Sequence, residues 1–552
     1  MPLFVKESLL FQLFSICVLV PYQQSKTKLF LERFFASIQR SYICTTIDEY
    51  LNKKPYFIES VTVKFISRFF DKMHILCQPL ARFRETTANG SGFVNFFEKY
   101  KPFELKLVLA MFIWGLAFCL FGLEAVGIAI FFAILIYLVL ADYQTVTYFL
   151  ALYPLLDYGI RMVVATMGGI WDELLFLGMV AVWIYKFVAY HKENGFKQTP
   201  LDIPIVMFLV AMTLVLLINS PNFTVAVDGY RAMIQYILWF FILLQLLKDH
   251  QGGKNICFVF LMVASLMALH GVYQFIIGVE MPSYWQDQAE EGVRTRVFSI
   301  LTSPNILGSL MTLSLPLCIA FGNIAKSIYG KLLFYAFACT MTLTLVFTFS
   351  RGAWIGFAAA VSIYVFFKDK KLFIPVILLG VLAICVVPGI SSRIAYMVSP
   401  AYIESSLRAG RLIRWITGLQ ILSEHPVLGV GLGHFGGAVA MNHEMAYLLG
   451  GVHEPTYYMD NNYLKIAVET GLFGLTAFVI LMYQIFVSGL RTIRITKDKE
   501  SREIVTGITA GLFGVMIHNF VENVFEVPMM TSVFFMLVAV MMHFWYINYY
   551  KN

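Results

Sequence analysis

The chain has 552 residues, of which 59% are hydrophobic and 14% charged, with a formal net charge of +7. Soluble domains usually carry about 25% charged residues, so a soluble fold would leave much apolar surface in water. We therefore expect an all-α, polytopic helical membrane protein, because helices satisfy their backbone hydrogen bonds inside the bilayer. The eight cysteines show no spacing typical of a zinc site, so we predict neither disulfides nor a metal.

Residues 1–103 differ from the rest of the chain, because fourteen Lys and Arg against eight Asp and Glu give them a net charge of +6. The stretch 57–70 is amphipathic, and the apolar stretch 9–20 is too short to span a bilayer. We interpret this region as cytoplasmic and lying against anionic lipid. A poorly ordered tail and, for the first residues, a signal peptide are the alternatives.

From residue 105 onward, apolar segments of roughly spanning length follow one another, and we expect about 12–14 transmembrane helices. This divides the chain into the basic N-terminal region, transmembrane helices (104–388), a large extracytoplasmic loop (389–462) and C-terminal transmembrane helices (463–552). The candidate spans are 105–122, 125–141, 144–165, 172–189, 203–219, 232–247, 256–278, 305–325, 331–349, 353–367, 372–388, 463–486, 504–522 and 530–547.

Basic residues predict the orientation, because cytoplasmic loops are rich in lysine and arginine. Five basic loops can all be cytoplasmic at once, which places both termini on the cytoplasmic side of the membrane. These loops are 186–197, 248–254, 326–331, 368–371 and 491–502. The opposite, outer side then receives the loops 220–231, 279–304 and 389–462.

The predicted outer loops and their flanks keep arginine while they almost lack lysine. Positive-inside loops explain the missing lysines but not the retained arginines. Guanidinium forks match phosphate oxygens and stay charged when partly desolvated, so an anionic ligand such as a lipid diphosphate is predicted here. Bridging of loops or contact with lipid headgroups is the alternative. The arginines are Arg161, Arg231, Arg294, Arg296, Arg351, Arg393, Arg408, Arg411 and Arg414.

Four motifs contain such polar residues, and three of them also contain glycines. They are Ser-Arg-Gly at 350–352, Arg-x-Arg at 294–296 before Ser-Pro-Asn at 303–305, Arg-x-x-Arg-Trp at 411–415 before Pro-x-x-Gly-x-Gly at 426–431, and Asp-Asn-Asn at 460–462 before Glu-Thr-Gly-x-x-Gly at 469–474. Arg411 and Arg414 are three residues apart, so on a helix they share a face. Gly352 would let backbones approach closely.

These motifs resemble those of the O-antigen ligase and polysaccharide polymerase family of bacterial membrane glycosyltransferases, over roughly residues 203–547. The family's C-terminal motif is a histidine, then Asn, Ser or Gln, nine residues, Gly-x-x-Gly and a small hydroxyl residue. In this chain nine residues separate Asn461 from Gly471, and Gly474 completes the glycine pair. Two positions depart from the motif, because Asp460 replaces the histidine and Leu475 the hydroxyl residue.

The resemblance implies a GT-C-like enzyme that takes a glycan from an undecaprenyl-diphosphate carrier at the outer face of the plasma membrane. The acceptor would be a hydroxyl of a lipid, a wall polymer or another glycan. The resemblance further implies an inverting reaction that needs no metal ion, and no cofactor is expected. We expect no nucleic-acid partner.

The site residues follow from this chemistry. A diphosphate leaving group needs fixed cations, and the attacking hydroxyl needs a base. We assign Asp460 and Arg351 as catalytic, with Asp460 as the base; capping of the following helix is its alternative role. Asn461, Glu469, His434 and His453 are expected to support the site, although Glu469 can instead pair with Lys465. The predicted diphosphate-binding residues are Arg231, Arg294, Arg296, Arg411 and Arg414.

Two other functions remain open on the sequence. A lipid-linked glycan transporter or flippase would also have many spans and buried charges, although it usually shows repeated halves, and no repeat is evident. A non-catalytic scaffold for envelope assembly is compatible with the missing histidine. Near the end of the chain, a polar patch is interpreted as cavity wall; its residues are His518, Asn519, Glu522 and Asn523.

Overall fold

The computed structural model describes residues 143–550, except for gaps at 164–167, 190–195, 281–294, 302, 370–377, 379–390, 392–394, 397–398, 409, 448–452 and 455–456. These described residues are almost entirely helical, with one small two-stranded sheet. The predicted all-α class is therefore confirmed. The basic N-terminal region, the spans predicted at 105–122 and 125–141, and almost all of the span at 372–388 lie outside the described residues.

Within the described ranges, six helices are long and apolar enough to cross a membrane. They are α14 (Phe223–Leu246), α15 (His250–Ile277), α16 (Pro304–Ile324), α17 (Ile328–Phe347), α24 (Asn462–Ile495) and α26 (Pro528–Tyr550). The helix α13 (Asp202–Ile218) is apolar but shorter. The protein is thus a multi-pass membrane protein.

Further helices pack against these six. They are α12 (Trp171–Ala189), α18 (Arg351–Lys368) and α25 (Lys499–His518). The weak span predicted at 144–165 is a broken series instead: the 3₁₀-helix η4 (Tyr143–Val146), α10 (Thr147–Ala151) and α11 (Tyr153–Val163). Pro154 lies in the first turn of α11, where a missing backbone N–H is tolerated.

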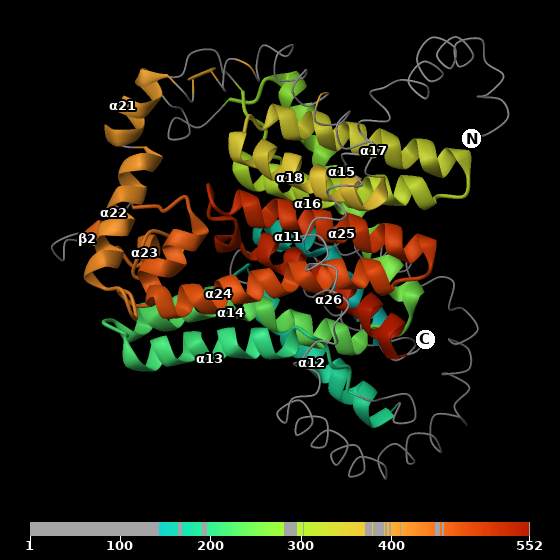
Figure 1. Ribbon diagram of the computed structural model, residues 1–552, viewed down its shortest axis with the longest axis horizontal. Helices are drawn as coiled ribbons and strands as arrows, with labels where there is room; N and C mark the ends of the chain where they lie inside the picture. Colours follow the sequence, from blue (N-terminus) through green and yellow to red (C-terminus); the bar gives the residue numbers. More distant parts are fainter. Residues whose placement is uncertain are drawn as a thin grey trace, which may run out of the picture. The chain divides into compact units, whose positions relative to one another are not determined.

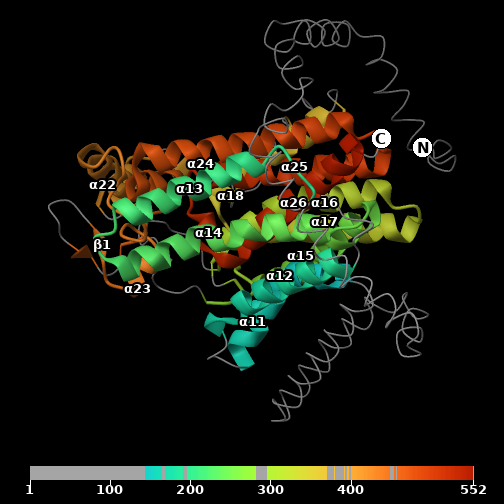
Figure 2. The same ribbon diagram turned by 90° about the horizontal axis from the view of Figure 1, so that it is seen from below.

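The predicted outer loop folds into three short helices and the sheet. The helices are α21 (Pro400–Arg408), α22 (Arg411–Glu424) and α23 (Ala438–Asn442), and the antiparallel strands are β1 (Ala446–Tyr447) and β2 (His453–Glu454). In two perpendicular views these elements lie at one end of α13, α14 and α24 (Figures 1 and 2). The loop therefore covers one end of the helices.

Capping residues decide where several helices begin. The side chain of Asn222 accepts hydrogen bonds from the N–H groups of Thr224 and Val225, so α14 begins at Phe223 rather than near 232. Ser303 caps α16 and Ser350 caps α18 in the same way. As a result, Arg231 lies inside α14 and not in the loop predicted at 220–231.

The helix α24 is broken at Gly471, whose φ of 67° and ψ of −172° are not helical. The segment 426–431 fills the break with backbone hydrogen bonds. The N–H of Val430 donates to the carbonyl of Val468 at 2.9 Å, and the N–H of Leu472 donates to that of Pro426 at 2.8 Å. Backbone groups that the break leaves without helical partners thus bond to the loop, as buried polar groups require.

Glycine is required on both sides of this contact. A Cβ at Gly471 would lie 2.1 Å from the carbonyl oxygen of Val427, and one at Gly429 would lie 2.3 Å from that of Val468. Both residues also have a positive φ. The glycines of the 426–431 and 469–474 motifs are therefore explained by their contact with each other.

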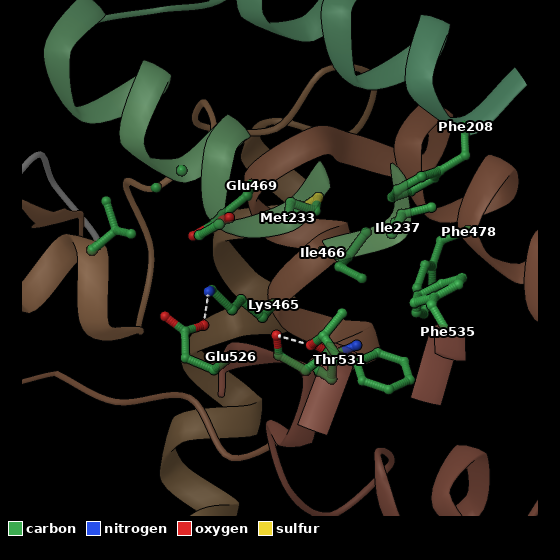
Figure 3. A pocket seen from close by; sticks show the side chains of 16 residues that line it. Phe208, Met233, Ile237, Lys465, Ile466, Glu469, Phe478, Glu526, Thr531 and Phe535 are labelled. Carbon is green, nitrogen blue, oxygen red and sulfur yellow. Dashed lines mark hydrogen bonds and ion pairs between the residues drawn. The ribbon is translucent and has the colours of Figure 1, made fainter. Parts of the chain in front are cut away.

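A buried ion pair fastens the same end of α24. Lys465 bonds to Glu526 in the 3₁₀-helix η10 (Val524–Glu526), and the two side chains are 10% and 7% exposed. Figure 3 shows the lysine pointing toward Glu526. Glu526 also accepts the N–H of Ala438 at the start of α23, at 2.7 Å. One carboxylate thus joins the loop, α24 and the turn before α26.

We expect Gly471→Ala to destabilise the protein by at least about 2 kcal/mol, because alanine at a positive φ is strained and its Cβ would also meet backbone. The thermal unfolding midpoint of the purified protein in detergent measures this. Gly178→Ala in α12 is the matched control, since a Cβ there would meet nothing within 4 Å. Equal midpoints for the two variants would contradict the account of the break.

Lys465→Met should destabilise the protein by about 3–5 kcal/mol, because it leaves the Glu526 carboxylate buried without its cation. The double variant Lys465→Met/Glu526→Gln should recover part of that loss, because residue 526 then carries no charge. Unfolding midpoints of the single and double variants provide the comparison. A double variant that is less stable than Lys465→Met alone would show that the buried charge is not the cause.

Candidate active site

Arg411, the first residue of α22, lies between two carboxylates. Its Nε donates to Oδ2 of Asp460 at 2.8 Å, and its Nη2 lies 3.4 Å from Oε2 of Glu522. Arg414, three residues later on the same face, lies 3.5 Å from the same Asp460 oxygen and donates to the carbonyl of Tyr458. The face shared by Arg411 and Arg414 is therefore turned toward Asp460.

The network continues from Glu522 to a fourth element. Asn305, near the start of α16, donates its side-chain N–H to Glu522. Arg296 donates to Oδ1 of Asn305 at 3.0 Å and to the carbonyl of Thr348 at 2.9 Å. Arginines predicted from separate motifs thus meet in one hydrogen-bonded network, which runs through the polar patch predicted near the end of the chain.

Arg351 begins α18 at the same end of the helices. Its guanidinium lies over the ring of Tyr402 at 5.0 Å and that of Tyr396 at 6.0 Å. Its Nη1 is buried and has no hydrogen-bond partner among the described residues. The neighbouring glycine lets α18 approach α25, because a Cβ at Gly352 would lie 2.8 Å from the ring of His518. Arg351 is thus a cation whose Nη1 donor is not used by any described residue.

Asp460 is buried, at 5% exposure. Its Oδ2 binds the two arginines, while its Oδ1 is buried and has no hydrogen-bond partner in the described part of the chain. Asn461 caps α24 instead, because its side chain accepts the N–H of Leu464 at 3.0 Å. The capping role that the sequence left open for Asp460 therefore falls to Asn461, and the Asp460 carboxylate is directed at the arginines.

Electrostatics keep Arg411 charged. Its burial acts to lower the pKa, but Asp460 and Glu522 outweigh this effect and hold the pKa of Arg411 above its usual value. Burial raises the pKa of Glu522, with Asp460 adding to the rise and Arg411 opposing it. The two carboxylates thus compete for one guanidinium.

Not every predicted arginine joins this network. Arg231 forms an ion pair with Glu173 of α12 and donates to the carbonyl of Gly169, with its side chain 49% exposed. Because α14 begins early, Arg231 is directed at α12 and not at Asp460. Arg408 pairs with Glu404 on the exposed side of α21. Arg294 and Arg393 lie outside the described residues.

The supporting histidines have different surroundings. His434 is buried, with Nδ1 2.8 Å from the carbonyl oxygen of Leu432, and the N–H of Asn222 donates to its Nε2 at 3.3 Å. It therefore ties the loop to the start of α14. His453 pairs with Tyr447 in the sheet, and its side chain lies outside the described part of the structure.

Glu469 forms a second charged group with Lys465 and Glu526. Its Oε1 accepts the N–H of Phe435 at 3.2 Å, while the hydrogen bond of Lys465 goes to Glu526. In Figure 3 the lysine lies between the two glutamates, at the polar side of a pocket that also contains Phe478. The alternative of a simple Lys465–Glu469 pair is therefore replaced by a three-residue cluster.

Within the described ranges, no group of three His, Cys, Asp or Glu side chains is arranged to hold a metal ion.

Sequence reasoning missed Glu526 and Tyr402. A carboxylate directly before the apolar helix α26 is a signal that could have been noticed, because buried charges near membrane spans usually have partners. Nothing local marks Tyr402 as a partner of Arg351, since the two residues come from different elements.

Two comparisons with known proteins found similar sequences. Residues 336–479 match the family model described as O-antigen ligase. The matched segment includes Arg351, Arg411, Arg414 and Asp460. The chain is also 25% identical, over 352 residues, to an O-antigen polymerase of Salmonella muenchen, in a match that covers 58% of this chain and 82% of that relative. By these matches, the chain is similar to proteins of the O-antigen ligase and polymerase family.

Proposed function

We propose that the protein is a glycosyltransferase that moves a glycan from an undecaprenyl-diphosphate carrier to an acceptor hydroxyl at the outer face of the plasma membrane. The observation that carries this proposal is the arrangement around Asp460. Asp460 binds Arg411 and Arg414, one of its buried oxygens has no hydrogen-bond partner among the described residues, and Arg351 lies at the same end of the helices. The similarity to the O-antigen ligase and polymerase family supports ligation or polymerisation as the reaction class.

The arginines suit the leaving group. When the bond between the sugar and the diphosphate breaks, negative charge grows on the diphosphate, and cations fixed beforehand stabilise that charge. Arg351 offers a buried Nη1 donor that is unused within the described residues. Arg411 and Arg414 are held on one helical face by Asp460. In this proposal fixed arginines stabilise the leaving group, and the reaction needs no metal ion.

Asp460 suits the base. The acceptor hydroxyl gives its proton to Oδ1, and its oxygen forms the new bond to the anomeric carbon. The old bond to the diphosphate breaks on the opposite face, and its electron pair leaves with the lipid diphosphate. Attack from the opposite face inverts the anomeric configuration. Atoms and charge balance without a further reactant.

The charges at the two ends of α25 support the proposed sidedness. At its start, Lys254 pairs with Glu500 and Lys368 pairs with Glu503. The arginine network lies beyond its other end, at Glu522. Lysine-rich ends favour the cytoplasm, so the arginine end would face outward, and both termini would then be cytoplasmic.

Asp460→Asn and Arg351→Ala should each reduce glycan transfer by at least about 100-fold, because one removes the base and the other a cation at the leaving group. Purified protein, given a lipid-linked glycan and candidate acceptors in EDTA, would be assayed for release of undecaprenyl diphosphate and for product length. Arg408→Ala is the control, since this exposed arginine pairs only with the exposed Glu404 among described residues.

Near-normal transfer in both variants would refute the site assignment. Movement of the carrier lipid across liposomes without release of the diphosphate would instead support a transporter. A longer glycan as product would indicate a polymerase, and a glycan on a new acceptor a ligase.

A further inference from the structure

The two guanidinium groups that face the proposed base already donate hydrogen bonds to carboxylates. Arg411 uses Nε for Asp460 and Nη2 for Glu522, and Arg414 uses Nη1 for Asp460. Arginine binds a phosphate most tightly through two neighbouring N–H groups at once. A diphosphate cannot take the Nε and Nη2 fork of Arg411 while both carboxylates remain in place.

The two carboxylates differ in what else holds them. Glu522 also accepts hydrogen bonds from the side chain of Asn305 and from the backbone N–H of Asn523. Asp460 has only the two arginines among the described residues, and its Oδ1 has no partner. An incoming anion therefore displaces Asp460 more readily than Glu522.

We propose that Asp460 is the internal counter-ion of Arg411 and Arg414 in the substrate-free site, and that the donor's diphosphate takes its place and thereby activates it as the base. This inference rests on the proposed function. Once the arginines turn to the diphosphate, the carboxylate no longer shares its charge with two cations. It then accepts the proton of the acceptor hydroxyl more readily.

This exchange imposes an order on the reaction. Without the donor, the negative charge of Asp460 is balanced by Arg411 and Arg414, and the carboxylate does not activate a hydroxyl or a water molecule. With the donor bound, the base becomes available at the moment when the sugar is in place. Glu522 stays on Arg411 and keeps the guanidinium oriented.

Equilibrium binding of undecaprenyl diphosphate to the full chain in nanodiscs tests the exchange. Asp460→Asn should bind the lipid about tenfold more tightly than the wild type while losing transfer, because the diphosphate no longer displaces a carboxylate; tenfold corresponds to about 1.4 kcal/mol. Asp460→Ala should bind more tightly as well. Glu404→Gln is the matched control, since it removes the same charge from the exposed side of α21 and should change binding less than twofold.

Glu522→Gln separates exchange from simple charge repulsion. Both carboxylates lie against Arg411, so repulsion alone predicts equal tightening in Asp460→Asn and Glu522→Gln. Exchange predicts clearly stronger tightening in Asp460→Asn, and an equal effect overturns it. Unfolding midpoints near that of the wild type establish that the variants are folded.

Two failures can be told apart. If the wild type neither binds the lipid diphosphate nor transfers a glycan, the proposed function fails. If the wild type binds and transfers but Asp460→Asn binds more weakly, the function stands. Asp460 then merely orients the arginines, and the exchange is wrong.

Discussion

The break of α24 at Gly471 is the constraint on which the site depends. The segment 426–431 is hydrogen-bonded into this break, directly after α22 and before the loop residues that lead to Asp460. One backbone contact therefore places both Arg411 and Asp460, which are far apart in sequence. Without it, the loop would lose its backbone hydrogen bonds to the break in α24. The anchoring requires glycine at these positions, because glycine adopts positive φ values without steric cost.

Two charged clusters flank the start of α24, and they differ in how completely they are satisfied. In the first, Glu526 accepts hydrogen bonds from Lys465 and from the N–H of Ala438. Burial acts to raise the pKa of Glu526, but Lys465 and these hydrogen bonds outweigh it and hold the pKa below its usual value. In the second, Arg351 and Asp460 each have a buried atom that bonds to no residue within the described ranges. Buried polar atoms are rarely left so unless they serve a purpose. The satisfied cluster fastens the loop, and the incomplete one is the place where a substrate would complete the hydrogen bonds.

The sequence predicts the helical spans well, because hydropathy over long segments is a strong signal. It also predicts the shared face of Arg411 and Arg414 and the approach at Gly352, since both follow from local geometry. The break in α24 could not be predicted, because an isolated glycine in an apolar helix is often tolerated. The prediction of Arg231 in an outer loop is wrong, because α14 begins after the cap at Asn222 and includes the residues of that loop. Partners such as Glu526 depend on tertiary contacts that no local pattern encodes.

The position of Glu522 along the chain has a consequence for biosynthesis. Arg296, Asn305, Arg351, Arg411 and Asp460 are all synthesised before Glu522, which follows α25. Until α25 is inserted, the arginines lack the acid that Asn305 and Arg411 share. The nascent chain therefore presents its cations with Asp460 before Glu522 is made. A chain arrested before the insertion of α25 would lack the Glu522 contact of Arg411 and, without Glu526, the fastening of its loop.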